Sequence, residues 1–356
     1  MTRTRWAGLT LLMIATAACG EPHYGALFGQ SCFLCHANPT GKGMRSLYAS
    51  QFFGPTYLSF KPVSFDLLEK VKPQLSETVT LGADLRTIWI SENTMSDTAS
   101  AGLSAPLSTN TGTISQMEGY IYLSIQPVEQ FEIYYSQGMA QASGRFEAYG
   151  LLQGLPIDGF VKAGQFQESF GWTFADHTSF VRTGLWSDYS GSVGEPPTPP
   201  HYGLGAEIGA RPLIFDITAS FTNKQTSYPT ARDVQKRWCS RLQVQQGIER
   251  LNLQVTLGGS WTLAPSSSRD PEYGYLLGSS RDEAWGGFGG IGWQGFRERL
   301  GCHGGFGFLT TSLLFEYDRR AWTPGFISST LISSAYSTTQ VSVMAQPGVW
   351  LVGGYD

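Results

Sequence analysis

The stretch VTLGADLRTIW, residues 79–89, alternates apolar and polar side chains with a period of two residues. Successive side chains of an extended chain point to opposite faces, so one face would carry the apolar side chains of Val79, Leu81, Ala83, Leu85 and Trp89. The opposite face would carry Thr80, Gly82, Asp84 and Arg86. The stretch therefore predicts a β-strand with one apolar and one polar face.

The same alternation continues from Glu77 to the end of the chain. YGLGAEIGAR (202–211) and LIFDITASF (213–221) are two such runs separated by Pro212, which predicts a hairpin. With further runs the total reaches about 14 strands, the others lying at about 116–126, 129–141, 145–153, 159–167, 178–187, 236–248, 250–262, 284–293, 305–317, 334–344 and 348–355. Short turns such as QPVEQ (126–130) alternate with long polar loops such as 91–115 and 187–200.

Strands of this length, with short turns on one side and long loops on the other, are typical of outer-membrane barrels. Several tryptophans near the ends of the expected strands fit an interface girdle: Trp89, Trp172, Trp186, Trp261, Trp293 and Trp322. We therefore expect an all-β fold, a transmembrane antiparallel β-barrel over residues 76–356. The alternative is a soluble β-sandwich or propeller, whose strands alternate as well.

The chain ends in QPGVWLVGGYD (346–356), without the terminal aromatic residue that commonly completes the last strand of such barrels. If the sequence is a fragment, we expect the barrel to be incomplete at its C-terminus.

Composition excludes several classes of function. Charged residues are 15% of the 356 residues, the net charge is −4, and no run of Lys or Arg could follow a phosphate backbone. Nucleic-acid binding is therefore not expected. The glycine-rich GGFGGIG (286–292) lies within a strand pattern and has no helix after it, so it does not predict a dinucleotide site. No catalytic triad or carboxylate pair is apparent, and hydrolase or transferase activity is not expected.

The first 19 residues have the layout of a secretory signal. Arg3 and Arg5 precede a mostly apolar run over residues 6–18 that is too short to cross a bilayer as a helix. Cleavage after Ala17 or Ala18 is one reading of this region. The other is lipidation of Cys19, which Gly20 follows as in a bacterial lipoprotein site. In both cases we expect an exported protein located in the outer membrane.

The segment between signal and strands, residues 20–75, contains SCFLCHANPTGKGMR at 31–45. Cys32, Cys35 and His36 have the C-x-x-C-H spacing of covalent c-type haem, in which two thiols bind the porphyrin and the imidazole binds the iron. A zinc site or a redox-active thiol pair is the alternative. Zinc would need four ligands, and the other Cys/His grouping, at 302–303, is distant in sequence. We expect a small haem-binding segment with one covalent haem c.

The sixth iron ligand has three candidates. Met44 lies eight residues after His36, His23 lies nine residues before Cys32, and His177 could reach the haem from the barrel. In an oxidising compartment Cys239 and Cys302 could also form a disulfide, but the sequence does not determine their pairing.

One C-x-x-C-H motif after a signal, joined to a barrel in a single chain, resembles the fused outer-membrane monohaem c-type cytochrome-porin family. Its best-known members oxidise extracellular ferrous iron. HANPTGKGMR (36–45) is similar to the short cytochrome segments found before predicted barrels in metal-respiring bacteria, and residues 160–182 are similar to a porin strand and loop. The resemblance implies thioether bonds at Cys32 and Cys35 and His36 as proximal ligand. This chain is shorter than the iron oxidases and differs from them around the haem motif.

The resemblance implies electron transfer between an extracellular donor or acceptor and periplasmic redox proteins such as cytochromes, with metal oxidation or reduction as the associated activity. One alternative is a solute channel with a non-conducting haem segment. The inward charges Arg86, Glu207, Arg211 and Asp216 look too scattered in sequence to select a solute. The other alternative is a periplasmic c-type cytochrome with a β-domain.

Overall fold

The computed structural model describes residues 32–50, 73–96, 107–139, 146–171, 202–223, 236–269, 276–295, 309–322, 332–346 and 349–355. In these ranges it contains the helical turn α3 (Cys32–Cys35), helical residues at 47–50, a 3-10 turn at Glu249–Leu251 and thirteen strands. The strands are β1 (Val79–Ser96), β2 (Leu107–Val128), β3 (Phe131–Gly138), β4 (Phe146–Leu155), β5 (Gly159–Gln167), β6 (Tyr202–Ala210), β7 (Phe215–Asn223), β8 (Lys236–Ile248), β9 (Leu253–Arg269), β10 (Leu276–Gly295), β11 (Leu309–Trp322), β12 (Ile332–Gln346) and β13 (Val349–Tyr355).

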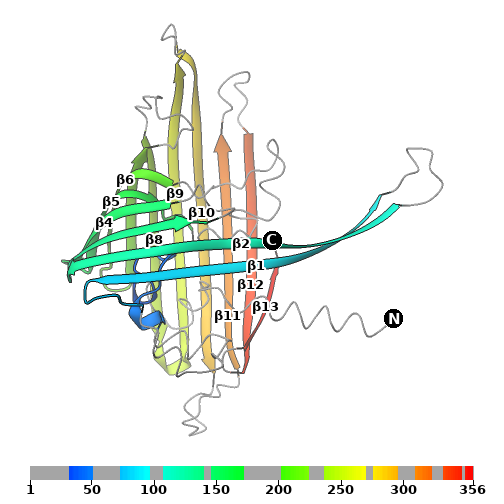
Figure 1. The fold of residues 1–356 in the computed structure, drawn as a ribbon, viewed down its shortest axis with the longest axis horizontal. Coiled ribbons are helices and arrows are strands. Elements are labelled where there is room, and N and C mark those ends of the chain that lie inside the picture. Colours follow the sequence, from blue (N-terminus) through cyan, green and yellow to red (C-terminus); the bar gives the residue numbers. More distant parts are fainter. Residues whose placement is uncertain are drawn as a thin grey trace.

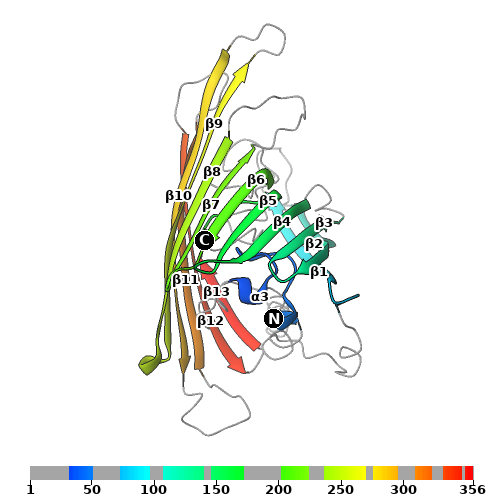
Figure 2. The ribbon, with the colours of Figure 1, turned by 90° about the vertical axis from the view of Figure 1, so that its left-hand side faces the viewer.

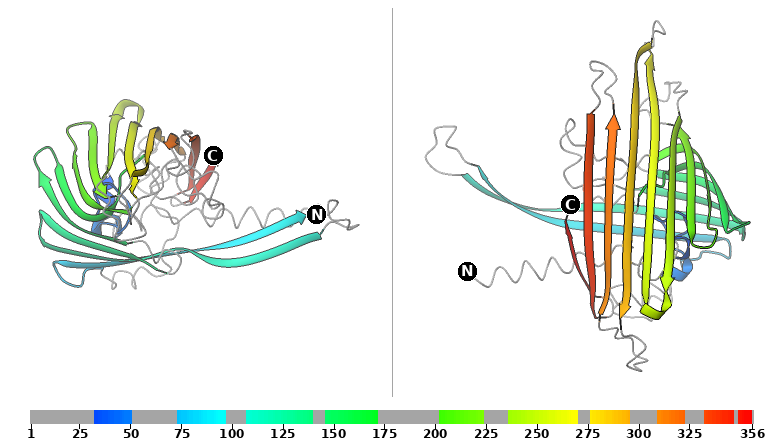
Figure 3. Two further views of the ribbon diagram at one scale, coloured as in Figure 1. Left: turned by 90° about the horizontal axis from the view of Figure 1, so that it is seen from above. Right: turned by 180° about the vertical axis from the view of Figure 1, so that it is seen from behind.

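All thirteen strands belong to one antiparallel sheet, in which each strand pairs with the next in sequence (Figure 1). The expected all-β, antiparallel fold is therefore confirmed. The sheet bends strongly, and α3 lies on its concave side (Figure 3). Among the described residues no ladder joins β13 to β1, so in this part of the chain the sheet is an open arc.

Two sequence predictions about the strands need comment. The prediction of a long loop over 91–115 is wrong at both ends, because β1 and β2 continue as a paired ribbon up to Ser96 and Leu107. Ser and Thr are the commonest residues of this stretch, and their polar character favoured a loop in the sequence analysis. Backbone pairing between β1 and β2 does not require apolar side chains, so the strands continue through them. The expected strand at 178–187 lies outside the described residues. The described strands on either side of it in sequence, β5 and β6, pair directly with each other.

The turns differ at the two ends of the sheet, as expected. The connections β2–β3, β4–β5, β6–β7 and β8–β9 have four residues or fewer, at 129–130, 156–158, 211–214 and 249–252. The β10–β11 connection at the same end, over 296–308, is an exception to the expected pattern. We call this end the short-turn end. At the opposite end the β5–β6 connection alone spans 168–201.

The two faces of the sheet have opposite chemistry. Along β3 the side chains alternate strictly: Phe131, Ile133 and Tyr135 are exposed, whereas Glu132 and Ser136 are buried. The buried face is the one against which the N-terminal segment packs, so the inner, concave face is polar and the outer face is apolar. This is the reverse of a soluble sheet, which buries its apolar face.

The apolar outer face extends over many strands. Its exposed side chains include Leu81, Leu85, Ile121, Leu152, Val161, Leu204, Ile208, Ile217, Phe221, Trp238, Leu242, Leu257, Trp285, Ile291, Leu313 and Phe315. A soluble monomer rarely exposes a contiguous apolar surface of this extent. The described part of the chain therefore does not support the soluble sandwich or propeller.

The tryptophan prediction holds at some positions only. Trp293 and Trp322 lie near or at strand ends, in β10 and β11, whereas Trp89 and Trp261 lie within β1 and β9. Trp172 and Trp186 lie outside the described residues. In the described ranges, none of the helical segments has the length and apolarity required to cross a membrane.

A substitution on the outer face can test whether this face contacts lipid or water. Replacing Leu242, exposed near the middle of β8, with Arg should lower the free energy of unfolding in lipid vesicles by about 2–4 kcal/mol, because a guanidinium would enter hydrocarbon. Urea titration of the refolded protein measures this change. As the matched control, Leu251→Arg at the short-turn end should change it by about 0–1 kcal/mol. Equal small effects at both positions would show that the outer face contacts water.

Candidate functional site

The C-x-x-C-H motif folds as one helical turn followed by a reversal of the chain. In α3 the His36 amide donates to the Cys32 carbonyl at 2.9 Å, and both cysteines are half-buried thiols. Residues three apart lie on the same side of a helix. The motif therefore presents its two thiols from one side, with His36 directly after them.

The reversal brings the residues after the motif back beside it. Arg45 forms an antiparallel bridge with His36, and the Ala37 amide donates to the Met44 carbonyl at 3.0 Å. Gly41, Lys42 and Gly43 all have positive φ, at 93°, 70° and 70°. Gly41 also allows close approach to the motif, since a Cβ there would lie 3.2 Å from the Cys32 Sγ.

Burial keeps the reactive groups of the motif uncharged. It raises the pKa of the Cys32 and Cys35 thiols, and for Cys32 the nearby positive charges of Arg241 and Arg211 offset this only in part. Burial, assisted by the positive charge of Arg45, lowers the pKa of His36 to about 4, with the backbone carbonyls of Gly43 and Lys42 opposing the change. A neutral imidazole is the form that binds a metal.

These residues fit a covalent haem. The buried His36 Nδ1 has no hydrogen-bond partner among the described residues, and an unsatisfied buried nitrogen is consistent with a site completed by a bound group. Beside the motif, Leu34, Leu47 and Tyr48 are exposed, and Ser46 Oγ donates to the Leu34 carbonyl at 2.7 Å, which keeps these apolar groups together. Such apolar surface suits a porphyrin. The described residues contain no group of three or more His, Cys, Asp and Glu placed to hold a metal ion directly.

Of the three candidates for the sixth ligand, only Met44 lies in the described residues. Its side chain is buried against the inner face, and a Cβ on Gly82 would lie 3.5 Å from its sulfur. Because Met44 precedes Arg45, the bridge partner of His36, its side chain points to the other side of the reversal. Its role as a ligand stays a prediction. His23 and His177 lie outside the described residues.

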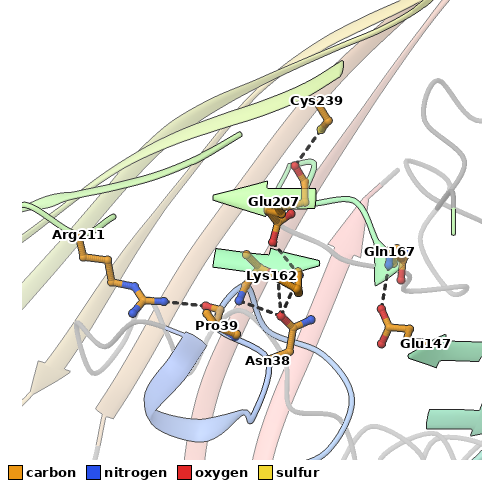
Figure 4. A network of polar contacts seen from close by, with 10 residues as sticks. Asn38, Pro39, Glu147, Lys162, Gln167, Glu207, Arg211 and Cys239 are labelled. Carbon is orange, nitrogen blue, oxygen red and sulfur yellow. Dashed lines mark hydrogen bonds and ion pairs between the residues drawn. The ribbon is translucent and has the colours of Figure 1, made fainter. Parts of the chain in front are cut away.

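The reversal is fixed to the inner face by a buried ion pair. Lys162 of β5 and Glu207 of β6 are both fully buried, and Lys162 Nζ lies 2.6 Å from Glu207 Oε1. The same ammonium donates to Asn38 Oδ1 at 3.2 Å (Figure 4) and lies over the rings of Tyr149 and Phe166, at 5.3 and 4.5 Å from their centroids. Asn38, two residues after the motif, is thereby held at the middle of the sheet.

An aromatic row forms the second contact. Tyr120, Tyr122, Tyr134 and Tyr149 follow one another across the inner face of β2, β3 and β4, and the last two stack with centroids 4.9 Å apart. The Tyr134 hydroxyl accepts a hydrogen bond from the Met44 amide at 3.0 Å. Lys42 donates to Gln167 and Tyr202 at the far end of β5 and β6.

The third contact lies at the short-turn end. Arg211 donates to the Pro39 carbonyl at 2.9 Å (Figure 4) and lies over the Phe33 ring at 5.3 Å. It also pairs with Asp158 and Asp216, at 3.2 and 3.7 Å. The view that the inward charges are scattered is therefore wrong for Arg211, Asp216 and Glu207, because the antiparallel register brings them to partners. The side chain of Arg86 is outside the described set.

We call the inner-face residues that contact the N-terminal segment the wall. Most of them were not identified in the sequence analysis. Lys162 and Tyr134 belong to alternating strands, so their face could be predicted, but their partners depend on the register between strands. Cys239 lies buried in β8, and its Sγ donates to the Ser169 carbonyl at 3.1 Å. The suggested disulfide with Cys302 is untested, since Cys302 lies outside the described residues.

Gly43→Ala should weaken the attachment of the segment to the wall. A methyl group there would overlap the Tyr134 hydroxyl, and the backbone has a φ of +70°. Limited proteolysis of the membrane-inserted protein should cleave the N-terminal segment several times faster than in wild type. Gly287→Ala is the control, since a Cβ there meets nothing within 4 Å. Equal cleavage of wild type and Gly43→Ala would contradict the docked arrangement.

The buried pair should behave as a unit. Lys162→Met leaves the Glu207 carboxylate buried without its partner and should lower the free energy of unfolding by about 3–5 kcal/mol. Adding Glu207→Gln should restore a large part of the loss, as a double-mutant cycle in lipid vesicles would show. Strictly additive losses would mean that the two side chains do not interact.

Comparisons with known proteins give distant similarity to solved structures. No protein-family description and no curated protein matches the chain. A solved structure described as the high pH structure of Pseudomonas putida OprB is 11% identical, covers 78% of this chain and 77% of its own, and superposes with a TM-score of 0.40. This similarity is too low to place the chain in a family.

Proposed function

We propose that this chain is an outer-membrane electron-transfer protein, in which a β-barrel encloses a covalently attached c-type haem and links an extracellular donor or acceptor to periplasmic redox proteins. The observation that carries the proposal is the attachment of a C-x-x-C-H motif to the buried polar face of a sheet whose outer face is apolar.

The outer face supports a membrane location. Strands such as β6 and β7 have nine residues, about 30 Å when extended, which matches the hydrocarbon thickness of a bilayer. Only helices and closed barrels satisfy their backbone groups in lipid. In this proposal the sheet therefore closes into a barrel, with its short turns in the periplasm.

The motif supports the electron-transfer role. When bound, haem c supplies a one-electron iron centre. Cys32 and Cys35 would hold the porphyrin through thioether bonds, and neutral His36 would provide the axial nitrogen. The contacts of Asn38, Lys42 and Met44 with the inner face would hold the motif inside the barrel, and the contact of Arg211 with Phe33 would hold its first turn near the short-turn end. The apolar surface around the motif would exclude water and limit the reorganisation that accompanies electron transfer.

The test uses outer-membrane fractions from a host that matures c-type cytochromes. Wild type should stain for covalent haem, and its reduced-minus-oxidised spectrum should appear when a membrane-impermeant ferrous donor is added to whole cells. Cys32→Ala together with Cys35→Ala should abolish covalent haem, whereas His36→Ala should mainly alter the spectrum and the potential.

The alternatives give different results. A covalent haem that stays oxidised with the external donor would favour a solute channel or a cytochrome that faces the periplasm. Absence of covalent haem would favour a zinc site or a disulfide at Cys32 and Cys35 instead. Normal electron transfer in the double cysteine variant would refute a conducting role for the motif.

A further inference from the structure

The short-turn end carries a repeated pattern of exposed apolar residues. Each of the five described elements at this end, from the start of β1 to the β8–β9 turn, has one: Leu75, Val128, Ile157, Leu213 and Leu251, with exposed fractions from 55% to 98%. Leu75 belongs to this end because its amide bonds to the Val79 carbonyl at the start of β1. We call residues 73–78, 126–130, 156–158, 211–214 and 249–252 the short-turn rim.

Two of these apolar residues occupy unfavourable backbone positions. Ile157 and Leu213 have φ values of 59° and 60°, a region in which Gly, Asn or Asp is favoured and a β-branched residue is an outlier. Each such residue carries a steric cost relative to an ordinary conformation, because its Cβ approaches the neighbouring carbonyl oxygen. Leu213, the most exposed of the five at 98%, gains nothing from burial within the chain that would offset this. Contact with something outside the chain would offset it.

Acidic residues accompany the apolar ones. Glu77, Glu129, Asp158 and Glu249 are all exposed on the rim, and Asp216 lies two residues after its 211–214 segment. The basic residues of the rim are Arg211, already paired with Asp158 and Asp216, and Arg250. The described rim is therefore net acidic. This charge disfavours anionic lipid and a second copy of the same rim, and it favours a basic protein.

The rim also adjoins the haem motif. The Arg211 amide bonds to the Ile157 carbonyl at 3.0 Å, joining two neighbouring turns, while its guanidinium contacts Pro39 and Phe33. Viewed from the side of these turns, α3 lies within the arc of the strands (Figure 2). A protein seated on the rim would come close to the motif.

We propose that the short-turn rim is the docking surface for a soluble, basic electron carrier, which binds through the apolar turn residues and is oriented by the acidic ones. This inference rests on the proposed function for its purpose, but the binding itself needs no haem in the chain. Small, partly apolar contact surfaces with complementary charge suit transient redox encounters.

The test measures association of the full-length protein in lipid nanodiscs with a basic monohaem cytochrome c. The matched probe is the same cytochrome with its lysines acetylated. Native cytochrome should associate faster at low salt than the acetylated form. The triple variant Glu77→Gln, Glu129→Gln, Glu249→Gln should lower its association rate constant by roughly tenfold. Val128→Ser with Leu251→Ser should instead raise the dissociation rate.

Each outcome separates docking from conduction. Equal association of wild type and the triple variant would overturn the docking surface even if external donors reduce the haem. Lower membrane insertion of the Val128→Ser, Leu251→Ser variant with unchanged association would show that the rim contacts lipid, and would also overturn it. Charge-dependent association that persists in the Cys32→Ala, Cys35→Ala variant would support the docking surface independently of haem. Should external donors also fail to reduce wild type, the proposed function would fail while the docking surface stands.

Discussion

The alternation of apolar and polar side chains along every well-described strand is the constraint on which the rest of this structure depends. An antiparallel sheet with one apolar face must give that face an apolar surrounding. Here the apolar face is the convex one, and the described chain leaves it uncovered. In the proposed function, the hydrocarbon of a membrane is the surrounding that removes this face from water. The polar face is then forced inward, where each charge needs a partner.

The N-terminal segment meets part of that need. Lys162 and Glu207 neutralise each other, and Asn38 supplies the lysine with a second acceptor, from outside the sheet. A buried pair of this kind adds little stability in itself, because desolvation of both groups opposes their attraction. The pair does make the position of the segment specific, because Lys162 loses its hydrogen bond to Asn38 if the reversal moves away from the sheet. The apolar side of the reversal, through Met44 and the tyrosine row, adds packing to the same arrangement. The haem motif is therefore located by contacts made outside the motif.

The sequence predicted the parts of the structure that depend on local pattern. The strand alternation of residues 79–89, the hairpin at 202–221 and the short turns of the first nine strands all appear as expected, whereas the haem-binding role of Cys32, Cys35 and His36 stays a prediction. Register, however, depends on pairings between strands and is not encoded in any one strand. For this reason the partners of Lys162 and Arg211, and the position of Met44 against Gly82, could not be predicted. The extension of β1 and β2 into the polar run 91–115 could not be predicted either, because it depends on backbone pairing between the two strands and not on the composition of either one.

The central claim is that electrons cross the membrane through the haem held inside the barrel, and one measurement tests it directly. Wild type is reconstituted in sealed vesicles that enclose an oxidised protein acceptor, and a ferrous donor coupled to a polymer too large for any pore is added outside. The account predicts reduction of the enclosed acceptor with wild type and none with Cys32→Ala, Cys35→Ala. Reduction at equal rates in both, or in neither while wild type carries covalent haem, would contradict it.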